Sequence, residues 1–179
     1  MSLRIISWNV NGFHSSGTRG PRKMVLRQEL QPALVGRIDV LLLQEHKLSA
    51  SQTRKCGKVL TGRSHTYWEP SIGEQGSSGG VCTSISAPLV QHVFGSGTLI
   101  PGRALLVGLN IEGSCIGILN IYAPTDLRQR AAFWRSLSYL LPEMDSWIVG
   151  GDFNNLEALE DQQGRGPEFL GIAQAEQLE

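Results

Sequence analysis

Four stretches of the sequence have the pattern of β-strands, and each ends in polar residues that can bind a metal ion or a phosphate group. The endings are Trp8-Asn9-Val10-Asn11-Gly12, Gln44-Glu45, Asn120-Ile121-Tyr122-Ala123-Pro124 and Gly150-Gly151-Asp152-Phe153-Asn154. A fold can bring the ends of distant strands together, so this recurrence predicts that the four segments contribute to one site. The recurrence is more informative than any of the four motifs alone.

Two of these endings carry a carboxylate. Glu45 directly follows an apolar run, where a carboxylate is costly unless a cation or strong donors lie near it. Asp152 follows two glycines, which would let a phosphate approach the backbone, so its carboxylate can act as a base towards water or as an acid towards a leaving oxygen. Asn154 can then hold a phosphoryl oxygen. Taken singly, Glu45 is most simply a surface glutamate at a strand end, and Asp152 with Asn154 most simply forms an Asx-type turn.

Asn9 and Asn11 occupy alternate positions, so their side chains would point to opposite faces of a strand unless the chain turns at Gly12. One amide can then face a metal ion or a phosphate while the other fixes the turn. Two turn-forming asparagines beside a glycine explain the pattern equally well. Tyr122 either donates a hydrogen bond to a phosphate oxygen or packs in the core.

The elements that must position these residues follow from hydrophobic periodicity and from turn residues, and they indicate a layered α/β protein. We expect a hairpin turn at Glu112-Gly113. The expected strands are residues 3–10, 39–44, 80–85, 89–94, 104–111, 115–122 and 147–151. The expected helices are residues 23–35, a helix capped by Ser49 or Ser51 that ends at Gly57 with Gly62, and a helix capped by Thr125 or Asp126 that ends near Pro142.

Composition limits the class of protein to which such a site can belong. The chain has 179 residues, 41% of them hydrophobic, which allows a real core and suits one domain. No apolar run approaches the roughly 18 residues that span a bilayer, and the chain opens on a strand pattern instead of a signal peptide. The three cysteines are widely spaced and predict neither disulfides nor a zinc site. We therefore expect an intracellular protein that does not enter a membrane.

The net charge of zero conceals an asymmetry along the chain. Residues 1–63 carry eleven Lys and Arg against three Asp and Glu, a net charge of +8, so the remainder carries −8. A basic segment of this kind suits contact with a polyanion, although solvated helix faces also produce such splits.

Taken together, the motifs resemble the endonuclease/exonuclease/phosphatase family, and within it the apurinic-type endonuclease domain of LINE-like, non-LTR retrotransposons. The resemblance extends over residues 3–155 and includes Gly79-Gly80-Val81 beside the four strand endings. It implies an α/β (α+β) fold, a four-layered sandwich of two packed mixed β-sheets with helices outside. It also implies a magnesium-dependent phosphodiesterase that nicks duplex DNA, in the nucleus when it acts on DNA.

The resemblance also implies roles for individual residues. Glu45 would be the main ligand of Mg²⁺, with Mn²⁺ as an alternative, and Asn9 and Asn11 would lie in the metal and phosphate shell, while Asp152 would orient or deprotonate the attacking water beside the metal. Tyr122 would bond the scissile phosphate and Asn154 would position it. From the basic segment, we expect phosphate contacts of the DNA to come from Arg19, Arg22, Lys23 and Arg27.

In the family pattern a further Asp, further strands and a terminal Ser-Asp-His follow Gly-Asp-Phe-Asn, whereas this sequence stops at Glu179 without them. We therefore expect residues 1–179 to form a single domain that is incomplete at its C-terminus, with the last strands missing, and to be weakly active or inactive on its own. Two other functions remain open. One is hydrolysis of an RNA or phosphoinositide phosphoester, and the other is a non-catalytic remnant that binds nucleic acid.

Overall fold

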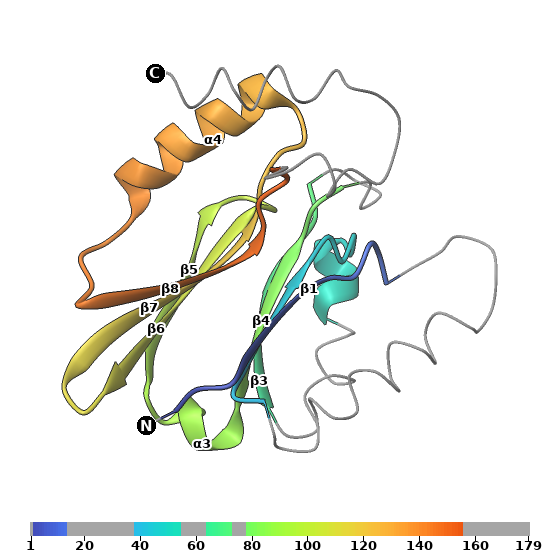
Figure 1. Cartoon of the computed structure of the whole chain (residues 1–179). Helices are drawn as coiled ribbons and strands as arrows, with labels where there is room; N and C mark the ends of the chain where they lie inside the picture. The colour runs from blue at the N-terminus through green and yellow to red at the C-terminus, as the bar shows by residue number, and fades with distance from the viewer. Residues whose placement is uncertain (1, 14–37, 55–63, 73–77, 156–179) are drawn as a thin grey trace.

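The computed structural model describes residues 2–13, 38–54, 64–72 and 78–155 (Figure 1). The expectations that fall on other residues lie outside this part of the chain. They are the helix at residues 23–35, the helix end at Gly57 and Gly62, and the basic residues Arg19, Arg22, Lys23 and Arg27.

Two four-stranded sheets form the described part of the molecule. In the first sheet β1 runs parallel to β2, and the other neighbouring pairs are antiparallel. Its strands, in spatial order, are β1 (Ile5–Asn9), β2 (Val40–Gln44), β4 (Val81–Ser86) and β3 (Ser64–Glu69). β2 is buried at every position, as its continuous apolar run predicts.

The second sheet is also mixed, since β7 and β8 run parallel and its other pairs are antiparallel. Its strands, in spatial order, are β5 (Val93–Ile100), β6 (Ala104–Ile111), β7 (Ser114–Tyr122) and β8 (Ser146–Asp152). Glu112 and Gly113 join β6 to β7, both with positive φ, as a two-residue turn of type I′ requires. The predicted hairpin is therefore confirmed.

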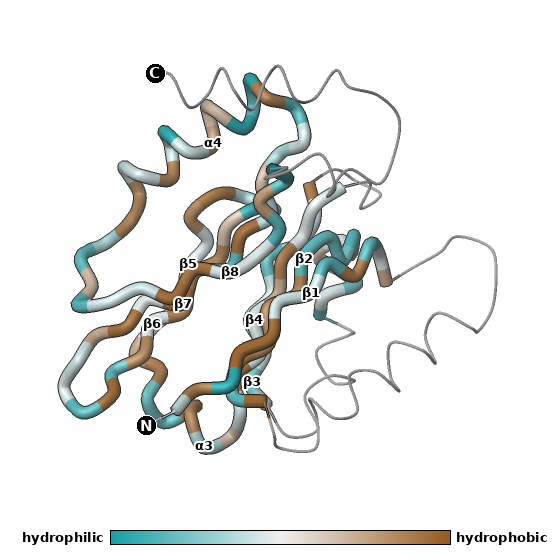
Figure 2. The backbone as a smooth tube through the Cα atoms, in the orientation of Figure 1, coloured by the Kyte–Doolittle hydropathy of each residue, from teal (hydrophilic) through white to brown (hydrophobic). Residues whose placement is uncertain are grey.

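The two sheets pack face to face, and apolar side chains from both fill the space between them. The hydrophobic stretches lie mainly on the strands, whereas the β6–β7 turn is hydrophilic (Figure 2). The core between the sheets consists of Val40, Leu42, Ile85, Leu89, Val107, Leu109 and Ile118. Burial of these side chains on folding is the main favourable contribution to stability.

Helices cover the outer faces of the sandwich. α4 (Leu127–Leu140) lies over the second sheet and packs Phe133 and Leu137 against it (Figure 1). Asp126 caps α4, because its side chain accepts a hydrogen bond from the Gln129 N–H at 2.9 Å. Residues 50–54 are helical and lie outside the first sheet. The predicted four-layered α/β sandwich is confirmed.

A helix on the first sheet's side begins with a capping box. The Ser49 hydroxyl lies 3.4 Å from the Gln52 N–H, and the Gln52 side chain accepts from the Ser49 N–H at 2.8 Å. Ser49 is thus the cap, and not Ser51. In the described part of the chain, no helix has both the length and the apolar character needed to cross a membrane.

One predicted strand is wrong in part. Residues 89–94 were expected to form a strand, but α3 (Ala87–Val90) occupies their start and β5 begins only at Val93. Pro88 favours the first turn of a helix, and β5 continues through Gly95 and Gly97 because β6 pairs with it along that length. β3 was not predicted either.

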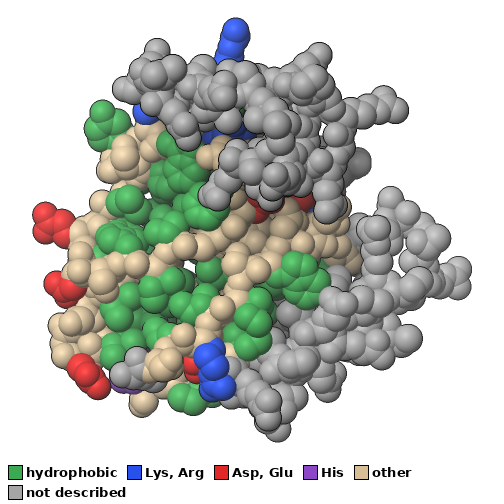
Figure 3. Space-filling view, in the orientation of Figure 1, with side chains coloured by type: hydrophobic (Ala, Val, Ile, Leu, Met, Phe, Trp, Pro, Cys, Tyr) green, Lys and Arg blue, Asp and Glu red, His purple; other side chains and the backbone are tan. Residues whose placement is uncertain are grey.

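β1 and β8 are the outer strands of their sheets and lie side by side at the same edge of the sandwich. Hydrophobic side chains reach the surface on this side of the molecule (Figure 3). Ile6 of β1 is 43% exposed and Val149 of β8 is 48% exposed. Among the described residues, β1 and β8 are thus edge strands, and their ends carry two of the polar motifs.

Candidate active site

The end of β2 places Glu45 through an unusual backbone conformation. Glu45 and Lys47 both have a positive φ, of 55° and 56°, which non-glycine residues seldom adopt. Backbone hydrogen bonds hold this segment, with the Gly12 N–H bonded to the Glu45 carbonyl at 2.7 Å and the His46 N–H bonded to the Gly80 carbonyl at 3.2 Å. Strained conformations of this kind persist where the surrounding contacts fix them, and they cluster at functional sites.

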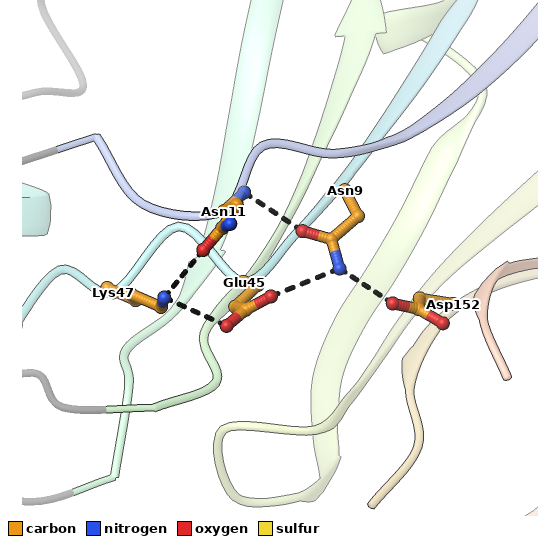
Figure 4. Close-up of polar contacts among 5 residues, drawn as sticks. All are labelled: Asn9, Asn11, Glu45, Lys47 and Asp152. Carbon is orange, nitrogen blue, oxygen red and sulfur yellow. Dashed lines mark hydrogen bonds and ion pairs between the residues drawn. The ribbon is translucent and has the colours of Figure 1, made fainter. Parts of the chain in front are cut away.

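Asn9, the last residue of β1, connects both carboxylates. Its Oδ1 accepts from the Asn11 N–H at 2.9 Å, which forms an Asx turn. Its Nδ2 donates to Glu45 Oε2 at 3.1 Å and to Asp152 Oδ2 at 2.6 Å (Figure 4). Asn9 therefore forms the turn and also contacts both carboxylates. One amide nitrogen joins residues that are 36 and 143 positions away in the sequence.

The end of β8 places Asp152 and Asn154. Asp152 Oδ1 accepts from the Asn154 N–H at 3.0 Å, again as an Asx turn, while its other oxygen faces Asn9. The Asn154 side chain donates to the Ala123 carbonyl at 2.6 Å. Buried Arg130 of α4 donates to the Asn154 carbonyl at 2.8 Å. The segment after β8 is thus attached to the end of β7 and to α4.

Tyr122, the last residue of β7, lies beneath these groups and is only 6% exposed. Burial, the negative charge of Glu45 and a hydrogen bond to Glu45 raise the pKa of the Tyr122 phenol to about 12, against the opposing effect of Arg103. The Arg103 guanidinium lies over the ring at 4.8 Å from its centroid. The phenol therefore stays protonated at neutral pH and can act as a hydrogen-bond donor.

His46, between Glu45 and Lys47, is fully buried. Its Nδ1 accepts from the Leu48 N–H at 3.0 Å, so its Nε2 carries the proton and donates to the Glu69 carbonyl at 3.0 Å. Burial lowers the pKa of His46 to about 4, so the ring is neutral. The ring also lies directly against Gly80, where a Cβ atom would come within 2.5 Å of it. His46 therefore supports the loop that carries Glu45.

Buried polar side chains join the two sheets directly beneath the site. Gln44 donates to Asn120 Oδ1 at 2.7 Å and to the Ser7 hydroxyl at 3.1 Å. Asn120 in turn donates to the carbonyls of Leu43 at 3.2 Å and Cys82 at 2.9 Å. These bonds fix the end of β2 relative to the end of β7, and hence Glu45 relative to Tyr122.

The structure brings together the predicted residues of all four strand endings. Two further residues at this site were not predicted from the sequence, namely Lys47, which bonds Glu45 and Asn11, and Arg103, which stacks on Tyr122. Lys47 lies two positions after Glu45 in a segment already singled out, which is the only sequence signal for it. Arg103 lies in none of the segments that the sequence singled out.

The donor atoms of this site suit a hard divalent cation. Among the described residues no three His, Cys, Asp or Glu side chains form a ready-made metal cluster. Mg²⁺, however, is usually held by one or two carboxylates together with waters and substrate phosphates, and not by an all-protein cage. Glu45 and Asp152, which share one amide donor, match that requirement, and no histidine or thiol contacts either carboxylate in the described part of the chain.

Comparison with known proteins identifies the family to which this arrangement belongs. Residues 6–164 match the model of the endonuclease/exonuclease/phosphatase family. The chain belongs to this family. The family name covers nucleases and phosphatases, which are hydrolases of phosphoesters, so the family resemblance predicted from the motifs is confirmed.

Individual relatives and solved structures are also similar to this chain. The chain is 32% identical over 160 residues to a Xenopus laevis protein described as the transposon TX1 uncharacterized 149 kDa protein, covering 86% of this chain and 11% of that protein. Among solved structures, the AP endonuclease LMAP of Leishmania major aligns with a TM-score of 0.69 and 20% identity, over 92% of this chain and 59% of that one.

A second solved structure has a bound nucleic acid. The 3′ phosphatase NExo from Neisseria, bound to a product DNA hairpin, aligns with a TM-score of 0.61 and 19% identity. The alignment covers 89% of this chain and 61% of that one. The chain therefore spans about three fifths of the solved structures and about a tenth of the transposon protein. At these identities the solved structures establish the fold.

Proposed function

We propose that this chain provides the metal-binding and phosphate-binding residues of a DNA-nicking endonuclease of the retrotransposon type. The observation that carries the proposal is the pair of hydrogen bonds made by the Asn9 amide. Asn9 ends β1, and its amide bonds both Glu45, directly after β2, and Asp152, at the end of β8. Family membership and the likeness to a transposon protein support the same function. Two solved structures with the same fold, an AP endonuclease and a 3′ phosphatase bound to a product DNA hairpin, support DNA as the substrate.

In this proposal Glu45 is the main ligand of Mg²⁺, or of Mn²⁺ in its place, with Asn9 and Asn11 around it. The cation, when bound, neutralises the charge that develops on the phosphate and on the leaving oxygen. Asn9 holds the two carboxylates at a fixed separation, so that Glu45 and Asp152 are already in place before substrate binds.

Asp152 orients or deprotonates the attacking water, and Asn154 and Tyr122 position the phosphate. Asp152 keeps one oxygen towards the turn at Asn154 and directs the other towards Asn9 and Glu45. The raised pKa of Tyr122 keeps its phenol protonated, which suits donation to a phosphate oxygen and excludes a phenolate nucleophile at neutral pH. Asn154 is placed beside Tyr122 through its bond to the Ala123 carbonyl.

Binding of duplex DNA would add phosphate contacts from Arg19, Arg22, Lys23 and Arg27, which lie outside the described residues. Replacing these residues with glutamate should weaken DNA binding and flatten its salt dependence, as measured by fluorescence anisotropy over a range of NaCl concentrations. Unchanged binding would remove them from the proposal. Because chromosomal DNA is the proposed substrate, we also place the protein's action in the nucleus.

The proposal is tested by comparing substrates and matched carboxylate variants. Supercoiled plasmid, poly(A) and a soluble phosphoinositide are incubated with the chain in Mg²⁺, beside Glu45→Gln and the exposed, distant control Glu112→Gln. Because we expect the chain to be weakly active, we expect slow plasmid nicking, which Glu112→Gln retains and which Glu45→Gln reduces by about 10²-fold or more, as for loss of a major electrostatic group.

Other outcomes assign the other functions. Preferential hydrolysis of poly(A) or of the phosphoinositide would replace the DNA endonuclease with a different phosphoesterase. A folded chain that binds DNA equally well with and without Glu45 and hydrolyses none of the three substrates would be the non-catalytic binding remnant. A single domain spanning residues 1–179 is part of the proposal, and one cooperative unfolding transition would support it.

A further inference from the structure

Both oxygens of Glu45 are engaged within the protein. Asn9 Nδ2 donates to Oε2 at 3.1 Å, and the ammonium of Lys47 lies 2.9 Å from Oε1 (Figure 4). The same ammonium donates to Asn11 Oδ1 at 2.7 Å. Lys47 therefore occupies, with a positive charge, the position on Glu45 that a metal ligand must offer to a cation.

The backbone fixes Lys47 in this position, so the contact differs from a chance pairing on the surface. Lys47 has a φ of 56°, and its N–H bonds the Gly79 carbonyl at 3.1 Å. Its methylene chain runs against Gly12, where a Cβ atom would lie 3.1 Å from Lys47 Cδ. The side chains of Lys47 and Glu45 are 28% and 18% exposed. A pair this shielded is screened less by salt than an exposed one.

We propose that Lys47 is a built-in counter-cation of the metal ligand Glu45, which neutralises the carboxylate before metal binds and competes with the metal for Oε1. The inference rests on the proposed function, because it takes Glu45 as the metal ligand. Lysine suits the task because its ammonium is a compact charge on a flexible stem, which can leave Oε1 and keep its bond to Asn11.

The sign of the effect follows from the charges at the site. The described charged groups there are the carboxylates of Glu45 and Asp152, the Lys47 ammonium, and the Arg103 guanidinium over Tyr122. Lys47 is the cation in direct contact with the ligand carboxylate. Removing its charge makes the site more negative by one unit and removes the ammonium from Oε1, so divalent cations should bind more tightly. A residue that merely holds Glu45 in place would have the opposite effect, since its loss would disorder the ligand.

Direct metal binding distinguishes these two effects without relying on activity. Mn²⁺ is titrated into the purified chain at constant pH and ionic strength, and the free ion is followed by its electron paramagnetic resonance signal. The variants are Lys47→Met, which removes the charge and keeps the length, and Lys47→Gln as a second neutral replacement. Lys47→Arg keeps the charge, and Arg135→Met removes a charge from the exposed face of α4.

We expect Lys47→Met and Lys47→Gln to lower the dissociation constant for Mn²⁺ by roughly tenfold, from the loss of one close like charge. Lys47→Arg and Arg135→Met should stay within about twofold of the unmodified chain. Adding Glu45→Gln to Lys47→Met should abolish the tightened binding. Circular dichroism spectra establish that each variant is folded, and the two neutral replacements guard against a defect peculiar to one of them.

The result that overturns the inference is a neutral variant that binds Mn²⁺ as weakly as the unmodified chain or more weakly. If that occurs while binding still depends on Glu45, the inference fails and the proposed metal site stands. If neither the unmodified chain nor Lys47→Met shows binding that depends on Glu45, both the inference and the proposed metal site fail.

Discussion

The two ends of the interface between the sheets are built from different chemistry, although the same strands supply both. On β2, Leu42 and Gln44 lie two positions apart on one face, and both are fully buried or nearly so. On β7, Ile118 and Asn120 have the same relation. Leu42 and Ile118 pack in the apolar core, whereas Gln44 and Asn120 bond one another beneath the site.

This difference separates stability from positioning. Apolar packing is non-directional, so it holds the sheets together without fixing their register to a fraction of an ångström. A buried amide pair is costly unless its bonds are made in one geometry, so it specifies how the two strand ends meet. The interface is thus apolar where packing stabilises the contact of the two sheets, and polar where Glu45 and Tyr122 must be aligned.

The largest effect on stability should come from the apolar end. Leu42→Ala removes a fully buried side chain between the sheets and should lower the free energy of unfolding by about 2–5 kcal/mol. The rate of plasmid nicking per folded molecule should stay nearly unchanged, because Leu42 belongs to the apolar core and makes none of the side-chain hydrogen bonds of the site. Urea denaturation measures the first quantity and initial rates at low temperature the second. A large loss of rate with little loss of stability would reverse the roles assigned to the two ends.

The second effect is on pH dependence and comes from the buried ring of His46. The pKa of His46 is lowered from its ordinary value of 6.5 to about 4, so below pH 6.5 the unfolded chain binds a proton that the folded chain does not. The contribution of His46 is therefore complete above pH 6.5 and is lost as the pH falls towards 4. At 1.36 kcal/mol for each pKa unit, the loss amounts to about 3 kcal/mol.

Urea denaturation at several pH values measures this loss, and His46→Gln serves as the control because other groups titrate in the same range. The difference in unfolding free energy between the two chains should shrink as the pH decreases from 6.5 to 4. A constant difference over that range would show that His46 is not buried as a neutral ring.

The third and smallest effect concerns the amide pair and is a test of coupling. Gln44→Leu should cost about 1–3 kcal/mol, because it leaves Asn120 Oδ1 buried without its donor. In the Gln44→Leu background, Asn120→Leu should lower the unfolding free energy by about 1 kcal/mol less than it does in the unmodified chain, and this difference is the coupling energy. Nicking by the double variant should nevertheless remain low, since Glu45 and Tyr122 lose their common support. Additive free energies would show that the pair does not act as a unit.

The sequence allowed much of this architecture to be predicted, because local patterns were unambiguous where strands are long and buried. Residues 104–111 are mostly apolar and are followed by Glu112-Gly113, so both β6 and the turn to β7 were predicted correctly. β5 was misplaced because its pairing with β6 overrides the low strand propensity of Gly95 and Gly97. β3 was missed among the short strands of the same region.

The site was predictable in its residues but not in its contacts. The four strand endings could be identified from residue type, and the Asx turns at Asn9 and Asp152 belong to the local chemistry of those side chains. The contact of Lys47 with Glu45 was not predictable, because it depends on the left-handed backbone conformation of both residues, which lie on either side of His46. Such conformations are selected by long-range bonds to Gly12 and Gly80, which no local pattern reveals.

In the proposed function, Glu45, Asn9 and Asp152 form a metal-dependent phosphodiesterase site. The most direct measurement is nicking of supercoiled plasmid by the 179-residue chain, in Mg²⁺ and in EDTA, beside Asp152→Ala. We predict slow relaxation of the plasmid in Mg²⁺, as for a weakly active chain, and no relaxation in EDTA or with the variant. Nicking that persists in EDTA or in Asp152→Ala would contradict the proposed site.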